Sequence, residues 1–210
     1  MSTESANETL RIGLFGGAFD PPHNAHVALA NAALEQFQLD ALYIIPTGQA
    51  WHKSRALSAP EHRLAMTRLA FENLSRVVVD DRELQRTGPT FTIDTLQALK
   101  DENPQSQLYL FIGADQFAAF QQWHKWREIL ELAIICIADR AQSTLAQTQF
   151  DAYAQQNHRF FTLKLPLMSV SATQVRQLMA SGAAAAFDAA KLVPGPVARY
   201  ISLHHLYGHR

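Results

Sequence analysis

Two histidines three residues apart, His23 and His26, stand where a helix is expected to begin and could donate hydrogen bonds to phosphate oxygens. They follow Gly16 and Gly17, which have no Cβ and would let a ligand lie directly against the main chain. The free backbone N–H groups and the positive dipole end of a helix N-terminus also favour an anion at such a place. The stretch from residue 13 to residue 26 therefore predicts a phosphate site.

Other interpretations of this stretch stay open. Its glycines run G-x-x-G-G rather than G-x-G-x-x-G, and no G-K-[ST] follows, so two better-known phosphate loops do not fit. The histidine pair could instead bind a metal ion, although Asp20 is the only nearby candidate for a third ligand. The pair could also be purely structural, at a capped helix start.

A second group of polar residues, Ser171, Thr173 and Arg176, lies in the first turn and a half of a helix expected over 171–179. Hydroxyls, free N–H groups and a guanidinium in one place would form a second anion site. A plain amphipathic helix capped by Ser171 is the competing interpretation.

Further candidates follow expected strands. Lys53 lies in a polar loop after the apolar run 41–45 and could either close on phosphates or be an ordinary solvated charge. Asp115 follows the run 108–112, where a carboxylate would face the crevice of an open sheet. An aromatic cluster comes next, formed by Phe117, Phe120, Trp123 and Trp126. Aromatic residues most often serve core packing, and a ring-stacking wall for a ligand is the alternative.

The elements that must position these residues alternate between strands and helices. Strands are expected at 10–15, 41–45, 77–79, 108–112, 133–138 and 159–165, and helices at 27–37, 60–71, 92–99, 171–179 and 197–206. Ser58 and Glu61 have the spacing of a capping box, with Leu64 and Leu69 expected to point inward from the helix that follows, and Thr92 is expected to cap the next helix.

This alternation predicts an α/β fold with a doubly wound, Rossmann-like parallel sheet, helices on both faces and a small helical C-terminal part. At 210 residues one domain is expected, with residues 1–9 as a loose N-terminal tail and residues 10–210 as the domain. The expected break before residue 197 is the stretch Val-Pro-Gly-Pro at 193–196.

Composition excludes several classes of function. The formal net charge of -1 argues against a surface for nucleic acid, and the longest apolar run is too short to cross a membrane. The one cysteine, Cys136, excludes an internal disulfide and fits a reducing compartment. The N-terminus is polar and acidic, so a cytoplasmic protein is expected.

Two motifs give a more specific identification. Residues 16–26, Gly-Gly-Ala-Phe-Asp-Pro-Pro-His-Asn-Ala-His, resemble the G-G-x-F-D-P-x-H-x-G-H signature of the nucleotidylyltransferase superfamily. Residues 170–176, Val-Ser-Ala-Thr-Gln-Val-Arg, resemble its second signature, I-S-S-T-x-x-R. Residues 83–96 resemble the E-x-x-R-x-G-x-S-Y-T-x-D-T-L stretch of bacterial nicotinate mononucleotide adenylyltransferases. The chain departs from these patterns by small changes at Ala25, at Ala172, and at Thr90-Phe91 in place of Ser-Tyr.

The resemblance implies transfer of AMP from ATP to nicotinate mononucleotide, giving nicotinate adenine dinucleotide and pyrophosphate in NAD biosynthesis. It implies catalysis by positioning and charge stabilisation, with Mg²⁺ held through the ATP phosphates and no metal ligand from the protein. The implied partners are these two substrates, with no nucleic acid and no membrane, and the oligomeric state is left open. A closely related alternative keeps the superfamily and changes the acceptor, for instance to phosphopantetheine.

The resemblance also implies a role for each matching position. At the ATP phosphates it places Gly16, Gly17, Phe19, His23, His26, Lys53, Ser171, Thr173 and Arg176, with His23, His26 and Arg176 as the catalytic residues. At nicotinate mononucleotide it places Gly17, Thr90, Thr92, Asp115 and Trp123. Trp123 would lie against the pyridine ring, and donors of the 90–92 segment would favour a carboxylate over an amide.

Overall fold

The computed structural model describes residues 9–48, 56–139, 159–165, 168–181 and 189–208. They form the predicted parallel sheet, which has six strands in the order β3-β2-β1-β4-β5-β6. The strands are β1 (Arg11–Gly17), β2 (Ala41–Pro46), β3 (Val77–Val79), β4 (Gln107–Gly113), β5 (Ala133–Asp139) and β6 (Phe160–Lys164). The predicted tail falls largely outside the described residues, so the division into tail and single domain stays a prediction.

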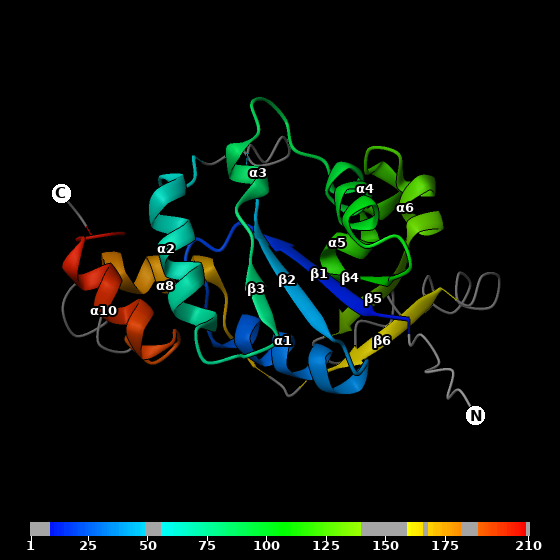
Figure 1. Cartoon of the computed structure of the whole chain (residues 1–210). Helices are drawn as coiled ribbons and strands as arrows, with labels where there is room; N and C mark the ends of the chain where they lie inside the picture. The colour runs from blue at the N-terminus through cyan, green and yellow to red at the C-terminus, as the bar shows by residue number, and fades with distance from the viewer. Residues whose placement is uncertain (1–8, 49–55, 140–158, 166–167, 182–188, 209–210) are drawn as a thin grey trace.

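Helices cover both faces of the sheet (Figure 1). The helices α1 (Asn24–Gln36), α2 (Pro60–Phe71), α8 (Ala172–Ala180) and α10 (Gly195–Leu203) share one core with the sheet. On the opposite face a second core includes residues of α4 (Thr92–Glu102), α5 (Ala114–Ala118), the 3₁₀ turn η1 (Phe120–Gln122) and α6 (Trp126–Leu132). A short helix, α3 (Arg82–Gln85), follows β3. No helix among these residues is long and apolar enough to cross a membrane.

The central strand β4 shows why an apolar run without alternation becomes a strand here. Leu108, Leu110 and Ile112 point into the core beneath α4, whereas Phe111 points into the core beneath α1. Successive side chains of a strand face opposite sides, so a strand covered on both faces is apolar throughout. The chain leaves β1 toward β2 and returns to the other side of β1 at β4, which creates a crevice at the carboxyl ends of these two strands.

Several helix starts differ from the prediction. The helix predicted from residue 27 begins at Asn24, so that His23 is the N-cap of α1. Thr92 is the first residue of α4, and the N-cap is Phe91. The last helix, α10, covers 195–203 instead of 197–206.

The spacing between Ser58 and Glu61 suggested that Ser58 is the N-cap of α2, but the structure shows that it is not. Ala59 holds that position and Pro60 opens the helix, while the backbone N–H of Ser58 donates to the carboxylate of Asp20. Of the two residues predicted to point inward, Leu64 and Leu69, both are only partly buried; Leu69 packs against the core that α2 shares with α1. The buried residues of α2 are Arg63, Met66, Thr67, Ala70 and Phe71.

Candidate active site

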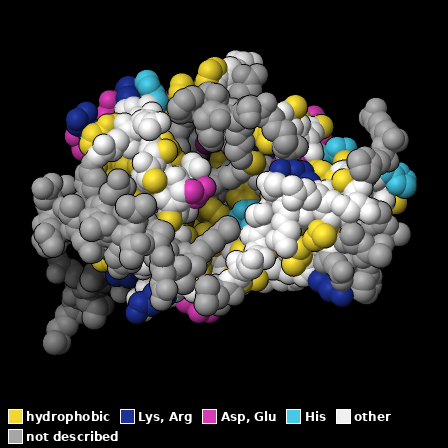
Figure 2. Space-filling model, turned by 180° about the vertical axis from the view of Figure 1, so that it is seen from behind, with side chains coloured by type: hydrophobic (Ala, Val, Ile, Leu, Met, Phe, Trp, Pro, Cys, Tyr) yellow, Lys and Arg dark blue, Asp and Glu magenta, His cyan; other side chains and the backbone are white. Residues whose placement is uncertain are grey.

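A cavity of about 640 Å³ opens at the carboxyl ends of β1 and β4. This volume is typical of sites for nucleotide-sized ligands. Predicted site residues that line it are Gly16, Gly17, His23, His26, Thr90, Thr92, Asp115, Trp123 and Ser171. The space-filling view shows this face hollowed, with apolar side chains inside the hollow (Figure 2). Lys53 lies outside the described residues.

The two histidines form one compact unit at the start of α1. The backbone N–H of His23 donates to Nδ1 of His26 at 3.1 Å, and the two rings stack with centroids 3.6 Å apart. Because Nδ1 of His26 accepts, the proton of its neutral ring is on Nε2, which is a donor. No acidic side chain stands in the first turn of α1, so none there competes with an anionic ligand.

The glycines before this unit differ in their surroundings. A Cβ added to Gly16 would meet no described atom within 4 Å, whereas one on Gly17 would lie 3.0 Å from the ring of Phe19. Phe19 has a left-handed backbone, with φ 47°, and its buried ring packs edge-on against Phe15 and Phe71. Phe19 therefore shapes the loop from inside the core and is not among the residues that line the cavity.

Asp20, the candidate third ligand of a metal pair, has other partners. Its carboxylate is 1% exposed and accepts hydrogen bonds from the phenol of Tyr207 at 2.7 Å and the backbone N–H of Ser58 at 3.2 Å. Within the described part of the chain, no three His, Cys, Asp or Glu side chains gather as a metal site would require. The described residues thus do not support the metal interpretation of His23 and His26.

The second predicted anion site borders the cavity from α8. Ser171 is the N-cap of this helix, as predicted, and its hydroxyl accepts from the backbone N–H of Gln174 at 3.2 Å. The guanidinium of Arg176 donates to Thr173 Oγ1 at 3.1 Å and to the carbonyl oxygen of Asp20 at 2.7 Å. Arg176 thus links α8 to the loop that carries the histidines, and neither it nor Thr173 lines the cavity.

The wall on the α4 side combines a buried hydroxyl with aromatic rings. Thr90 is 7% exposed, and its Oγ1 has no hydrogen-bond partner among the described residues. The ring of Phe91 lies 4.5 Å from that of His124, and Trp123 packs on Phe120 with ring centroids 5.5 Å apart. This wall therefore offers a donor beside flat apolar surfaces.

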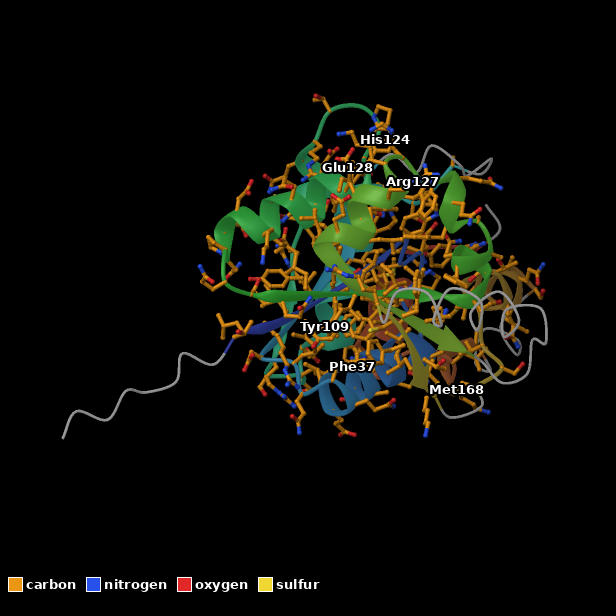
Figure 3. The ribbon with its side chains drawn as sticks, turned by 90° about the vertical axis from the view of Figure 1, so that its right-hand side faces the viewer. Phe37, Tyr109, His124, Arg127, Glu128 and Met168 are labelled. Carbon is orange, nitrogen blue, oxygen red and sulfur yellow. The ribbon has the colours of Figure 1, made fainter. Side chains whose placement is uncertain are left out.

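Sequence reasoning missed two residues that line this wall, Glu83 and His124. Glu83 is buried and accepts from Thr95 Oγ1 at 2.9 Å, to which Arg86 also donates at 2.9 Å. The motif around residues 83–96 was a signal for Glu83. His124 precedes α6, and Figure 3 labels its side chain together with those of Arg127 and Glu128 of that helix. No motif in the sequence pointed to His124.

Asp115 stands in the first turn of the short helix α5, exposed at the edge of the cavity. One of its carboxylate oxygens would lie 2.6 Å from a Cβ added to Gly113. The side chain therefore folds back over the end of β4, and a larger residue at 113 would displace it.

Comparison with known proteins gives one consistent result. Residues 14–178 match the family model described as cytidylyltransferase-like. A probable nicotinate-nucleotide adenylyltransferase of Albidiferax ferrireducens is 53% identical over 197 residues, which cover 94% of this chain and 98% of that protein. Another, from Methylibium petroleiphilum, is 38% identical and covers 97% of this chain and 95% of that protein.

Solved structures share the fold. The nicotinic acid mononucleotide adenylyltransferase of Plasmodium falciparum, complexed with APC, superimposes with a TM-score of 0.77 at 18% identity, over 94% of this chain and 97% of that one. The same protein complexed with NaAD gives a TM-score of 0.75 at 19% identity and the same coverage.

Proposed function

The chain belongs to the nicotinate-nucleotide adenylyltransferases of the cytidylyltransferase-like family, and we propose that its cavity is where AMP passes from ATP to nicotinate mononucleotide. The products are nicotinate adenine dinucleotide, an intermediate of NAD biosynthesis, and pyrophosphate. The observation that carries the proposal is the meeting of Gly16, His26 and Ser171 around one cavity. These residues supply an open main chain, a ring N–H donor and a helix N-cap.

The ATP phosphates lie, in this proposal, between the start of α1 and the start of α8. The attacking phosphate of the acceptor is already an anion, so the protein needs neither a strong general base nor a covalent intermediate. Its task is to align the two substrates and to stabilise charge as pyrophosphate leaves. In this proposal His26 Nε2–H and His23 donate to the phosphate oxygens, and Ser171 bounds the other side. Thr173 and Arg176, which lie just outside the lining of the cavity, are proposed to reach the phosphates from behind Ser171.

In this proposal Mg²⁺ would be held through the phosphates of ATP and not by ligands from the protein. The described residues contain no cluster of three ligating side chains, and the Asp20 carboxylate is held by Tyr207 and Ser58. These side chains fit a Mg²⁺ ion that the substrate would carry. The ion would offset the charge of the triphosphate. Lys53, which lies outside the described residues, is proposed to add a positive charge that binds the triphosphate.

The pyridine end of the acceptor lies against Trp123 in this proposal, with its carboxylate near Thr90 and Thr92. The buried Oγ1 of Thr90 can donate to a carboxylate, whereas the NH₂ of an amide would bring a further donor that needs an acceptor. Asp115 is proposed to accept from a ribose hydroxyl at the edge of the cavity. These contacts favour nicotinate over nicotinamide mononucleotide.

Initial rates of pyrophosphate release test the proposal, with ATP and Mg²⁺ present and each acceptor in turn. We expect a high rate with nicotinate mononucleotide, a much lower one with nicotinamide mononucleotide and none with phosphopantetheine. Equal rates with the two mononucleotides would refute the specificity. ATP binding without product from any acceptor would instead indicate a nucleotide-binding regulator.

A further inference from the structure

Segments far apart in the sequence meet at Asp20, in the loop between β1 and α1. Tyr207, 187 residues away, donates its phenol proton to Asp20 Oδ1 at 2.7 Å. Ser58, 38 residues away, donates its backbone N–H to Oδ2 at 3.2 Å. Arg176, 156 residues away, donates to the carbonyl oxygen of the same residue at 2.7 Å. One residue thus joins the histidine loop to α2, to α8 and to the C-terminal segment.

Arg63 completes this cluster from α2. Its side chain is 2% exposed, and it donates Nη1 to the carbonyl oxygen of Ala18 at 3.0 Å and Nε to that of Ser58 at 3.1 Å. Burial lowers the pKa of this guanidinium, and the charge of Asp20 opposes that shift. A buried carboxylate is tolerated where hydrogen bonds and an opposite charge compensate it, and this cluster supplies both.

The phenol of Tyr207 is a dedicated donor in this cluster. Burial, and next the charge of Asp20, raise its pKa, so the phenol keeps its proton. Apart from Asp20, the phenol contacts the side chain of Ser58, whose hydrogen bond opposes the rise in pKa, and Met66 Sδ at 3.8 Å, which is a weak acceptor. Its strong hydrogen bond therefore goes to the carboxylate, and such charge-assisted bonds are about twice as strong as neutral ones.

The backbone on both sides of this hydrogen bond is strained. Tyr207 has φ 65° and Phe19, the residue before Asp20, has φ 47°, both in the left-handed region that non-glycine residues seldom adopt. Such conformations persist where surrounding contacts hold them. The bond between Tyr207 and Asp20 joins these two segments directly, so it is a contact that can hold both.

We propose that Tyr207 is a positioning residue for adenylyl transfer, which through Asp20 fixes the loop that carries His23 and His26. The loop leaves β1 at Gly17 and reaches the N-cap of α1 at His23, so Asp20 lies between the open main chain and the ring donors. The same residue holds Arg176 of α8, the helix whose N-cap, Ser171, lines the opposite wall. The position of Asp20 therefore sets both sides of the phosphate site. This inference rests on the proposed function.

The test compares Tyr207→Phe with Tyr200→Phe. Tyr200 is the matched control, because it lies on α10 in the same C-terminal part and its phenol pairs with Nδ1 of His62 at 3.0 Å, away from the loop. For both variants we would measure kcat, the KM of each substrate, the stoichiometry of ATP binding by calorimetry, and the melting temperature.

Tyr207→Phe should lower kcat by about tenfold, as expected for the loss of one charge-assisted hydrogen bond that aligns the reacting groups. Both KM values and the stoichiometry should stay within about twofold, since ground-state binding is largely kept. Tyr200→Phe should behave as the native protein. In an Asp20→Asn background, the further loss from Tyr207→Phe should be small, because the two residues act as one unit.

Three results would overturn the proposal. A native kcat in Tyr207→Phe would show that the bond does not matter, and an equal loss in Tyr200→Phe would show a general effect of the C-terminal part. If Tyr207→Phe bound fewer ATP molecules per chain but kept the native rate per bound ATP, the role of Tyr207 would be merely structural. If Tyr207→Phe does not fold, Asp20→Asn alone must show the same loss of kcat. If the protein without substitutions formed no product, that result would instead refute the proposed function.

Discussion

The ring of His23 lies almost flat on the ring of His26, with planes 16° apart, and the backbone N–H of His23 donates to Nδ1 of His26. His26 thus closes the first turn of α1 with one nitrogen and leaves the other as a donor. Capping and donation use different atoms. A side chain that offers an acceptor at the position of Nδ1 but does not reach the position of Nε2 can therefore separate the two roles.

Substitution of His26 tests this separation. His26→Asn keeps an acceptor for the His23 N–H, so it should melt close to the native protein, whereas His26→Ala should lose about 1 kcal/mol of stability. Both should bind ATP and lose about 10²-fold or more in kcat, because neither places a donor where Nε2 stood. Calorimetry and steady-state rates measure the two effects. A near-native kcat in His26→Asn would contradict the catalytic role.

The two adjacent glycines should respond oppositely to alanine. At Gly16 a Cβ meets no described atom within 4 Å and extends into the cavity. Gly16→Ala should therefore keep or raise stability by about 0.4–1 kcal/mol while the KM for ATP rises by about tenfold or more. Gly17→Ala should destabilise by about 1–3 kcal/mol, since its Cβ would press on the buried ring of Phe19. Denaturant unfolding and ATP kinetics distinguish them, and a native KM in Gly16→Ala would argue against close approach of the phosphates.

Thr90 should decide between the acid and the amide acceptor. Thr90→Val has nearly the same shape and removes a buried hydroxyl that has no partner among the described residues, so stability should not fall. The ratio of kcat/KM for nicotinate over nicotinamide mononucleotide should drop by about tenfold. Thr90→Ser keeps the hydroxyl and serves as the control, with a ratio close to native. An unchanged ratio in Thr90→Val would assign the selectivity to other donors.

Much of the fold follows from local pattern. Most strands are apolar runs that flanking polar or turn residues bound, and β4 needed no more than the run from Leu108 to Ile112. The edge strand β6 instead mixes buried and exposed residues. Helix starts were less predictable, because α1 is capped by a histidine, which is not a typical cap residue. The N-cap of α2 is Ala59 and not Ser58, whose backbone N–H instead donates to Asp20, 38 residues away in the sequence.

In the site, too, features that depend on neighbouring residues in the sequence were predictable, whereas those that depend on long-range contacts were not. Gly16, His23 and His26 are close in the chain, so their spacing predicted a shared location, and all three line the same cavity. The position of Ser171 on the opposite wall followed from the second motif, not from spacing. The cluster around Asp20 could not be predicted, since Tyr207 lies 187 residues away and nothing in the expected helix 60–71 indicated that Arg63 is buried. Pairings of this kind depend on the topology and not on the local sequence.

The single cysteine predicts how stability changes with pH. Cys136 is fully buried in β5, and burial raises its thiol pKa far above the ordinary value of 9.0. Above pH 9 the unfolded chain loses this proton while the folded chain keeps it. The free energy of unfolding should therefore be unaffected by this group below pH 8 and fall by about 1.4 kcal/mol between pH 8 and pH 10.

Cys136→Ala provides the control for that decline. The variant should be less stable at every pH because it leaves a small cavity, but its stability should fall less steeply between pH 8 and pH 10. Burial also raises the pKa values of Tyr109 and Tyr207, which add a further decline from about pH 10 in both proteins, so only the difference between the two curves reports on the thiol. Urea unfolding across this range gives both curves. Parallel curves would show that the thiol ionises equally in the folded and unfolded chain, and would contradict its burial in β5.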